Sequence, residues 1–185
     1  MPDLPFPLAG TTLIVGPSNV GKTRLTARAL TVWLEREGTD GVVVLEFAPE
    51  VERDGRILGG RLDRFGTPPA DVWRGVLDAH APRATAGSEG EAVDLAADNA
   101  RRAGELFDGA PADPRAVFVN DATIPFQTLD ADPSRLLGYC EQAETAVLNA
   151  LSGDAIAGDD PVSRAERETL STLGQRADRV VELDG

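Results

Sequence analysis

Lysine is almost absent from this chain: 17 of its 18 basic residues are arginine, and the only lysine is Lys22. An ammonium group is a compact charge that reaches between phosphate groups, whereas a guanidinium group is a planar fork. The single lysine in a chain that otherwise uses arginine therefore directs attention to the segment around Lys22.

Cysteine, histidine and long apolar runs are also scarce. Cys140 is the only cysteine, which excludes an internal disulfide and suits a reducing compartment. His80 is the only histidine, so neither a histidine metal cluster nor a histidine-based triad has support. No run approaches the roughly 18 apolar residues of a membrane helix, and the N-terminus lacks the pattern of a signal peptide. We therefore expect a cytoplasmic protein with no membrane partner.

Acidic residues outnumber basic residues by 31 to 18, which gives a formal net charge of -13. The acidic residues are spread along the chain, which makes the charge a surface property that opposes unspecific attraction to nucleic acid. A nucleic-acid partner is therefore not expected. Few lysines, many acidic residues and 5% aromatics resemble the composition of haloarchaeal proteins, whose surfaces work in molar salt. A GC-rich genome is the alternative explanation, since it also replaces lysine with arginine.

The length of 185 residues predicts a single domain over residues 1–185. Buried strands are predicted at 11–15, 41–47, 115–121 and 179–183, and helices from 22 to Gly38, at 92–107, from 132 to about 143, and after a capping box at Ser163–Glu166. Residues 145–149 are either a strand or a continuation of the preceding helix. This alternation predicts a three-layer α/β/α fold with a mostly parallel sheet of about five strands.

The segment at about 48–90 is predicted to be flexible or lid-like. Residues 48–70 lack clear periodicity and are rich in glycine, which indicates a loop or a broken helix. A short helix is predicted at 71–80, and a mobile segment at 82–90.

Residues 16–23, Gly-Pro-Ser-Asn-Val-Gly-Lys-Thr, match the complete pattern GxxxxGK[ST] between a predicted strand and a predicted helix. The glycines allow successive backbone N–H groups to point at a β-phosphate, and the helix N-terminus adds its positive end. We expect Lys22 to bridge the β- and γ-phosphates, and the Thr23 hydroxyl to bind Mg²⁺. The residues expected to bind nucleotide are Gly16, Pro17, Ser18, Asn19, Val20, Gly21, Lys22, Thr23 and Arg24.

Acidic residues at the ends of two predicted strands are candidates for the remaining chemistry. The strand at 115–121 ends in Asp121 and resembles a Walker B strand, so Asp121 is the second expected contact of Mg²⁺. Ala122 follows where some families have a glutamate, so a general base must come from elsewhere. Glu46 and Glu50 are the candidates, because ligands gather at the carboxyl ends of parallel strands. The alternative is that both are ordinary solvated loop acids.

On these motifs, the chain resembles the P-loop NTPase superfamily. Guanine-specific GTPases and the ParA type each require a further lysine that this chain lacks. ABC-type ATPases expect a glutamate at the position of Ala122 and the signature LSGGQ, from which residues 151–154, Leu-Ser-Gly-Asp, depart. These three branches are therefore disfavoured.

Two branches of the superfamily remain as interpretations. RecA/KaiC-like ATPases carry a catalytic glutamate at the end of the strand after the phosphate-loop helix, where this chain has Glu46 and Glu50. An adenosylcobinamide kinase-like enzyme is the alternative, with the arginine-rich segment 53–64 forming the pocket of an anionic small-molecule acceptor. A slow nucleotide-dependent switch is the third possibility, and nucleotide-dependent formation of a homo-oligomer would favour the ATPase or the switch. The first interpretation predicts an Mg²⁺-dependent protein that binds and hydrolyses ATP.

Overall fold

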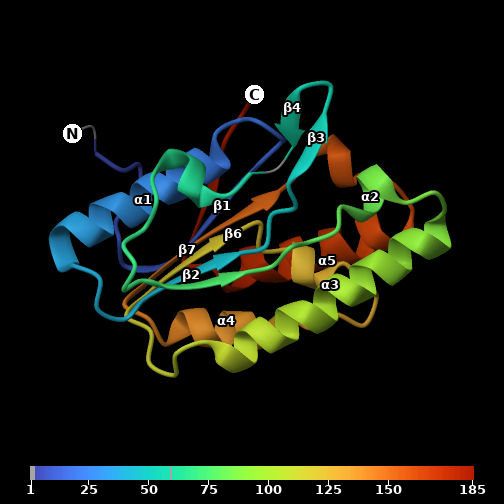
Figure 1. The fold of residues 1–185 in the computed structure, drawn as a ribbon. Coiled ribbons are helices and arrows are strands. Elements are labelled where there is room, and N and C mark those ends of the chain that lie inside the picture. The colour runs from blue at the N-terminus through green and yellow to red at the C-terminus, as the bar shows by residue number, and fades with distance from the viewer. Residues whose placement is uncertain (1–2, 59) are drawn as a thin grey trace.

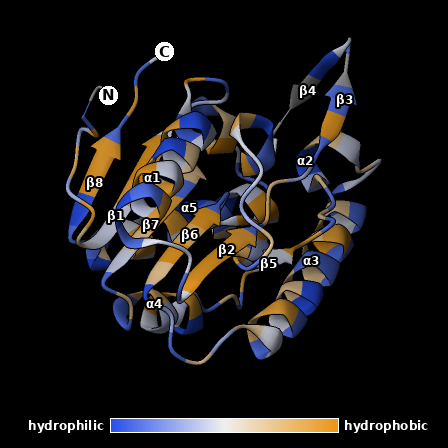
Figure 2. Ribbon diagram, turned by 60° about the vertical axis from the view of Figure 1, so that its left-hand side comes forward, coloured by the Kyte–Doolittle hydropathy of each residue, from blue (hydrophilic) through white to orange (hydrophobic). Residues whose placement is uncertain are grey.

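The computed structural model describes residues 3–58 and 60–185. Its centre is a six-stranded sheet in the order β5-β2-β6-β7-β1-β8 (Figure 1 and Figure 2). The strands are β1 (Gly10–Gly16), β2 (Val42–Glu46), β5 (Trp73–Val76), β6 (Ala116–Asn120), β7 (Thr145–Leu151) and β8 (Arg179–Glu182). All neighbouring strands pair in parallel, so their carboxyl ends meet at one edge of the sheet.

Helices cover both faces of this sheet. They are α1 (Lys22–Glu37), α2 (Pro82–Thr85), α3 (Glu89–Gly109), α4 (Ser134–Glu141) and α5 (Pro161–Arg176), with short 3₁₀ turns η1 (Leu62–Phe65), η2 (Ile124–Phe126) and η3 (Asp154–Ile156). None of the helices in the described part of the chain combines the length and apolar content needed to cross a membrane.

Alternation along the strands divides the core between the two faces. Odd-numbered residues of β1, β2 and β6 pack with α3, α4 and α5, whereas their even-numbered residues pack with α1 and η1. Hydrophobic residues are accordingly concentrated in the strands, and the helices around them show mixed colouring (Figure 2). The predicted α/β class with a mostly parallel sheet is confirmed, in three layers.

The ambiguous segment at residues 145–149 is a strand. It belongs to β7, which lies between β1 and β6 and is buried over residues 145–150. A strand in that position pairs on both sides, which a continued helix could not do. The predicted end of the first helix is also confirmed, because Gly38 has a φ of 81° and its N–H donates to the Leu34 carbonyl at 3.1 Å.

The predicted helix at residues 71–80 is wrong. Residues Trp73–Val76 instead form β5, a sixth strand that pairs with β2 at the edge of the sheet. The unpaired edge of β2 offers backbone partners to an extended segment, and Gly75 weakens a short helix. Sequence periodicity alone does not predict this pairing, because the partner strand lies 27 or more residues earlier, at Val42–Glu46.

The rest of the segment at 48–90 also contains regular structure. An antiparallel hairpin of β3 (Val51–Arg53) and β4 (Arg56–Leu58) and the turn η1 lie where a loop or broken helix was predicted. Helix α2 and the start of α3 lie within residues 82–90, separated by residues 86–88. Gly59 lies outside the described residues, and the flexibility of the segment stays a prediction.

The last helix begins differently from the prediction. Asp160 is the N-cap of α5, and its carboxylate accepts a hydrogen bond from the Ser163 N–H at 2.9 Å. Pro161 occupies the first turn, where its fixed φ suits a helix start. Ser163 therefore lies within the first turn instead of capping it, and Glu166 is a buried residue in the body of the helix.

Candidate functional site

The chain between β1 and α1 turns sharply around residues that tolerate unusual backbone angles. Asn19 and Gly21 have φ values of 64° and 99°. At Gly16 a Cβ atom would lie 2.5 Å from the Leu183 carbonyl oxygen, so this close approach requires glycine. The turn ends at Lys22, the first residue of the 16-residue helix α1, whose first N–H groups lack intrahelical partners. Loop and helix start together present backbone donors, which is the arrangement that binds phosphate.

A cavity of about 540 Å³ opens at the carboxyl ends of the strands. Its walls come from the β1–α1 loop, the segment after β2, η1, α2, the ends of β6 and β7, and α5. Six of the residues predicted to bind nucleotide line it: Ser18, Asn19, Gly21, Lys22, Thr23 and Arg24. Gly16, Pro17 and Val20 do not line the cavity, and they shape the loop instead.

The charge of the cavity wall differs from that of the whole chain. Four basic residues line it, namely Lys22, Arg24, Arg64 and Arg83, against two acidic residues, Asp121 and Glu166. The chain as a whole carries a net charge of -13. A local excess of cationic groups in a concave site favours an anionic ligand, because the low-dielectric walls concentrate the field.

Lys22 and Asp121 share this cavity and influence each other's ionisation. The Lys22 ammonium donates to the Pro17 carbonyl, and burial lowers the pKa of Lys22 while the Asp121 charge opposes this change. Burial, together with the nearby Glu166 charge, raises the pKa of Asp121 to about 7, against the opposing effects of Lys22 and Arg83. The charges of Lys22, which is predicted to bind phosphate, and of Asp121, which is predicted to bind the metal, therefore affect each other's pKa.

A buried amide connects α1 with the end of β6. Asn149, on β7, donates to the Asn120 side-chain oxygen at 3.0 Å and to the Thr26 hydroxyl oxygen at 2.9 Å. Its own side-chain oxygen accepts from the Asp121 N–H at 2.9 Å. The Thr23 hydroxyl donates to the same Asn120 oxygen at 3.3 Å. Sequence reasoning missed Asn149, although a polar residue near the end of a buried strand is a usable signal.

The two predicted general-base candidates lie outside the cavity wall. The Glu46 carboxylate is fully buried and accepts from the Leu62 N–H at 2.9 Å and from the Asn120 amide at 3.0 Å. Burial raises the pKa of Glu46, and these two hydrogen bonds oppose that rise. Glu50 is exposed and forms an ion pair with Arg64 at 3.5 Å. The structure does not bring either carboxylate to the cavity, and a role as general base stays a prediction.

Glu166 is a second buried carboxylate that sequence reasoning assigned to a helix cap. Its oxygens accept from the Thr123 hydroxyl at 2.8 Å and from the Gln127 amide at 2.9 Å, and Arg83 forms an ion pair with it. The signal that could have found it is helical spacing: Glu166 lies on the buried face of α5 with Val162, Thr169 and Leu173. A carboxylate on such a face needs partners, and here they are Arg83 of α2 and the two residues that flank η2, Thr123 and Gln127.

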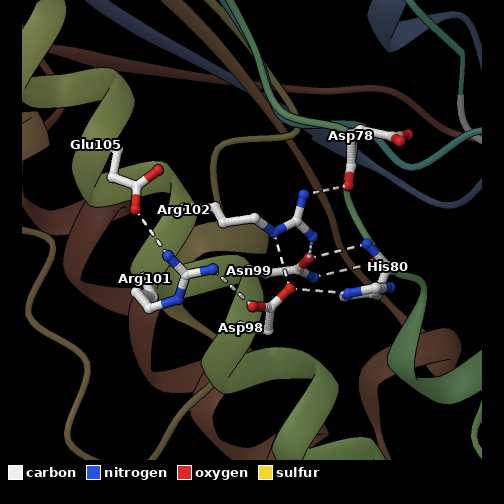
Figure 3. Close-up of polar contacts among 7 residues, drawn as sticks. All are labelled: Asp78, His80, Asp98, Asn99, Arg101, Arg102 and Glu105. Atoms are coloured by element: carbon white, nitrogen blue, oxygen red, sulfur yellow. Dashed lines mark hydrogen bonds and ion pairs between the residues drawn. The ribbon is translucent and has the colours of Figure 1, made fainter.

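The helix that carries Arg83 is held in place by a polar network on α3 (Figure 3). The Asn99 side chain accepts from the His80 N–H at 2.8 Å and donates to the His80 carbonyl at 3.0 Å. The His80 ring also contacts Asp98 at 2.9 Å, and Arg102 donates to the Asp78 carbonyl at 2.6 Å. Because His80 precedes α2 closely in sequence, these contacts fix where α2 begins and thereby position its arginine at the cavity.

Comparison with known proteins adds no family assignment. No protein-family model matches the chain, and no curated protein matches it significantly in sequence. Support for a function therefore comes from the chemistry of the site itself.

Proposed function

We propose that the chain binds ATP with Mg²⁺ and hydrolyses it, as a P-loop protein similar to RecA/KaiC-like ATPases. The observation that carries this proposal is that Lys22 and Thr23, at the start of α1, line the same cavity as Asp121, at the end of β6. These are the three side chains that the motif assigns to phosphate and metal binding. Their separation in sequence is about 100 residues, so the fold has to bring them together.

The phosphates of the nucleotide would bind to the loop. The backbone N–H groups around Gly21 and at the start of α1 donate to the β-phosphate, and the Lys22 ammonium bridges the β- and γ-phosphates. Lys22 is the only lysine in the chain and is partly buried, so polyphosphate oxygens would replace its contact with the Pro17 carbonyl. Burial lowers the pKa of Lys22, and an added anion would restore its preference for the charged form.

The oxygen atoms of Thr23 and Asp121 fit Mg²⁺, which prefers hard oxygen ligands. No group of three or more His, Cys, Asp or Glu side chains with the geometry of a metal site occurs among residues 3–58 and 60–185. A phosphate-bound Mg²⁺ needs only one or two protein ligands and completes its shell with phosphates and water. When bound there, it would neutralise charge on the β- and γ-phosphates. The raised pKa of Asp121 agrees with a carboxyl group that lacks a full counter-charge.

The remaining polar residues would hold these groups in position. The Asn149 side chain holds the backbone at Asp121 through a hydrogen bond, and the Asn120 side-chain oxygen accepts a hydrogen bond from the Thr23 hydroxyl. Glu46 does not line the cavity itself, but it accepts a hydrogen bond from the amide of Asn120, which does, and so would hold Asn120 in position. Catalysis would then consist of positioning and charge neutralisation, which is the main contribution of proteins to phosphoryl transfer.

The test compares Lys22→Ala with Arg36→Ala, which removes a positive charge from the far end of the same helix. Phosphate release from Mg·ATP is measured in molar KCl without any acceptor, together with Mg·ATP affinity and the circular dichroism spectrum. Lys22→Ala is expected to lose phosphate release and most of its affinity while retaining the folded spectrum. Arg36→Ala should behave as the wild type. Unchanged Mg·ATP affinity in Lys22→Ala would contradict nucleotide binding at this loop.

A small-molecule kinase is the second candidate, and the lining of the cavity favours it. The cavity volume of about 540 Å³ lies within the usual range of ligand pockets. Apolar residues, including Ala48, Pro49, Phe65 and Pro82, line the part contributed by η1, α2 and the segment after β2. Tight Mg·ATP binding without phosphate release would favour this candidate.

A further inference from the structure

Asn120, at the end of β6, has a buried side-chain amide that makes four hydrogen bonds. Its nitrogen Nδ2 donates to the Gly60 carbonyl at 2.7 Å and to a Glu46 carboxylate oxygen at 3.0 Å. Its oxygen Oδ1 accepts from the Asn149 amide at 3.0 Å and from the Thr23 hydroxyl at 3.3 Å. One amide therefore joins the start of α1, the carboxyl-terminal parts of β2 and β7, and the segment after β4.

The orientation of this amide follows from the chemistry of its partners. The Gly60 carbonyl only accepts hydrogen bonds, so the Asn120 nitrogen has to face it. The Asn120 oxygen then faces Thr23, which is predicted to bind Mg²⁺. Turning the amide round would place its oxygen against the Gly60 carbonyl oxygen. The amide is thus a connection with two fixed ends, one at the phosphate loop and one at the segment after β4.

That segment, residues 60–66, carries two exposed side chains at the cavity. Its backbone is held at Leu62, whose N–H donates to Glu46 at 2.9 Å and whose side chain belongs to the apolar cluster that α1 helps to form. Arg64 and Phe65 are exposed and line the cavity. The start of the segment is therefore anchored to the end of the sheet, and its later part borders the space where a ligand would bind.

The hydrogen bond from Thr23 is the longest of the four. Its length of 3.3 Å exceeds the usual range of about 2.5–3.0 Å for a hydroxyl donor and an oxygen acceptor. A hydroxyl group whose oxygen binds a cation becomes a stronger donor through its proton. Hydrogen bonds in a chain polarise one another, so a stronger bond to Oδ1 also strengthens the bonds that Nδ2 donates. A ligand shifts a conformational equilibrium only through an interaction that differs between the two states, and this bond supplies one.

We propose that Asn120 is a positioning residue that transmits occupancy of the phosphate loop to residues 60–66. When the Thr23 hydroxyl binds the metal of a nucleotide complex, the segment that carries Arg64 and Phe65 is held more firmly at the cavity. This inference rests on the proposed binding of Mg²⁺ and nucleotide. It adds a conformational response that depends on binding alone, so it does not require hydrolysis.

The experiment measures amide hydrogen exchange of residues 16–24 and 60–66 by mass spectrometry in molar KCl. Three states are compared: no ligand, ADP with EDTA, and Mg·ADP. ADP is used so that no turnover occurs, and its concentration is raised in each variant until the protection of residues 16–24 is complete. The melting temperature of each variant is measured to confirm that it is folded.

Two variants interrupt the connection at its opposite ends. Asn120→Asp keeps an oxygen toward Thr23 but has no N–H group to donate to Gly60. Thr23→Val keeps the shape of the side chain but has no hydroxyl. Asn99→Asp is the matched control, because it makes the same change in a buried asparagine on α3 whose hydrogen bonds go to residues outside 60–66.

We expect Mg·ADP to slow the exchange of residues 60–66 in the wild type by about tenfold, because local opening then has to break strengthened hydrogen bonds. ADP with EDTA should protect residues 16–24 alone. In Asn120→Asp and Thr23→Val, Mg·ADP should still protect residues 16–24 but give no further protection of residues 60–66. Asn99→Asp should respond to Mg·ADP as the wild type does.

Two outcomes would overturn the inference and leave nucleotide binding standing. Protection of residues 60–66 that persists in Asn120→Asp would mean that the ligand contacts Arg64 or Phe65 directly. Protection of residues 16–24 in the wild type without any change in residues 60–66 would mean that no signal passes. The proposed function fails separately, if neither ADP nor Mg·ADP protects residues 16–24 or if Lys22→Ala has the Mg·ATP affinity of the wild type.

Discussion

Replacement of Asn149 by alanine tests whether the buried amide on β7 organises the candidate site. Its side chain makes three hydrogen bonds, of 2.9, 2.9 and 3.0 Å, to Thr26, Asp121 and Asn120, and its relative exposure is 2%. Alanine removes all three and adds no polar group. The measured quantities are the free energy of unfolding and the affinity for Mg·ATP.

The magnitude follows from what each partner retains. Thr26 still donates to the Lys22 carbonyl, and Asn120 still accepts from Thr23, so each of these two losses costs about 1 kcal/mol. The Asp121 N–H is left with no replacement partner and costs about 1–3 kcal/mol as an unsatisfied donor. The expected loss in free energy of unfolding is therefore about 3–5 kcal/mol, a large part of the stability of a typical domain.

Urea titrations in molar KCl measure this loss, with Gln142→Ala as the exposed control, which should change the free energy of unfolding by less than about 0.5 kcal/mol. The affinity of Asn149→Ala for Mg·ATP should also fall, since the backbone at Asp121 is no longer fixed. A loss below about 1 kcal/mol would refute the reasoning, because it would mean that water replaces the amide at little cost.

Two more substitutions test other parts of the structure. The folded chain keeps a proton on Asp121 up to about pH 7, whereas the unfolded chain loses it near pH 3.8, so this group lowers the free energy of unfolding as pH rises between these values. Asp121→Asn should therefore be more stable than the wild type at pH 8, by up to about 4 kcal/mol, and the difference should shrink toward pH 4 in urea titrations; a difference independent of pH would contradict this. Asn99→Ala leaves the backbone N–H and carbonyl of His80 without their side-chain partner and should cost about 2–4 kcal/mol. The exposed residue Asp94 on the same helix provides the control, and equal stability of Asn99→Ala and Asp94→Ala would show that the network in Figure 3 is not a restraint on α2.

The parts of the fold that were predictable are those in which local sequence decides the structure. The glycine loop at 16–23 lies between an apolar run and a helical pattern, and β1 and α1 form on either side of it. Gly38 ends the helix because few other residues adopt its backbone angles at low cost. These features depend on neighbours within a few residues in sequence.

The parts that were missed depend on distant partners. Trp73–Val76 forms a strand because it pairs with the free edge of β2. The four-residue segment has no hydropathy pattern of its own that predicts a strand. Glu166 lies on α5, Gln127 follows η2 and Arg83 lies on α2, and no spacing within any one element predicts that these side chains contact one another. One missed feature is local in sequence: Asp160, followed by Pro161, is the N-cap of α5 in place of the predicted capping box, because Asp-Pro is the stronger helix start.

The solitary lysine also gives the protein an unusual chemical handle. Lys22 carries the only side-chain amine in the sequence, and it lies at the cavity wall. Burial lowers its pKa, which leaves more of the amine unprotonated and nucleophilic at a given pH. Acylating reagents, which in most proteins react with many surface lysines, have one side-chain amine to modify here, so acylation at Lys22 can report on occupancy of the site without any engineered residue.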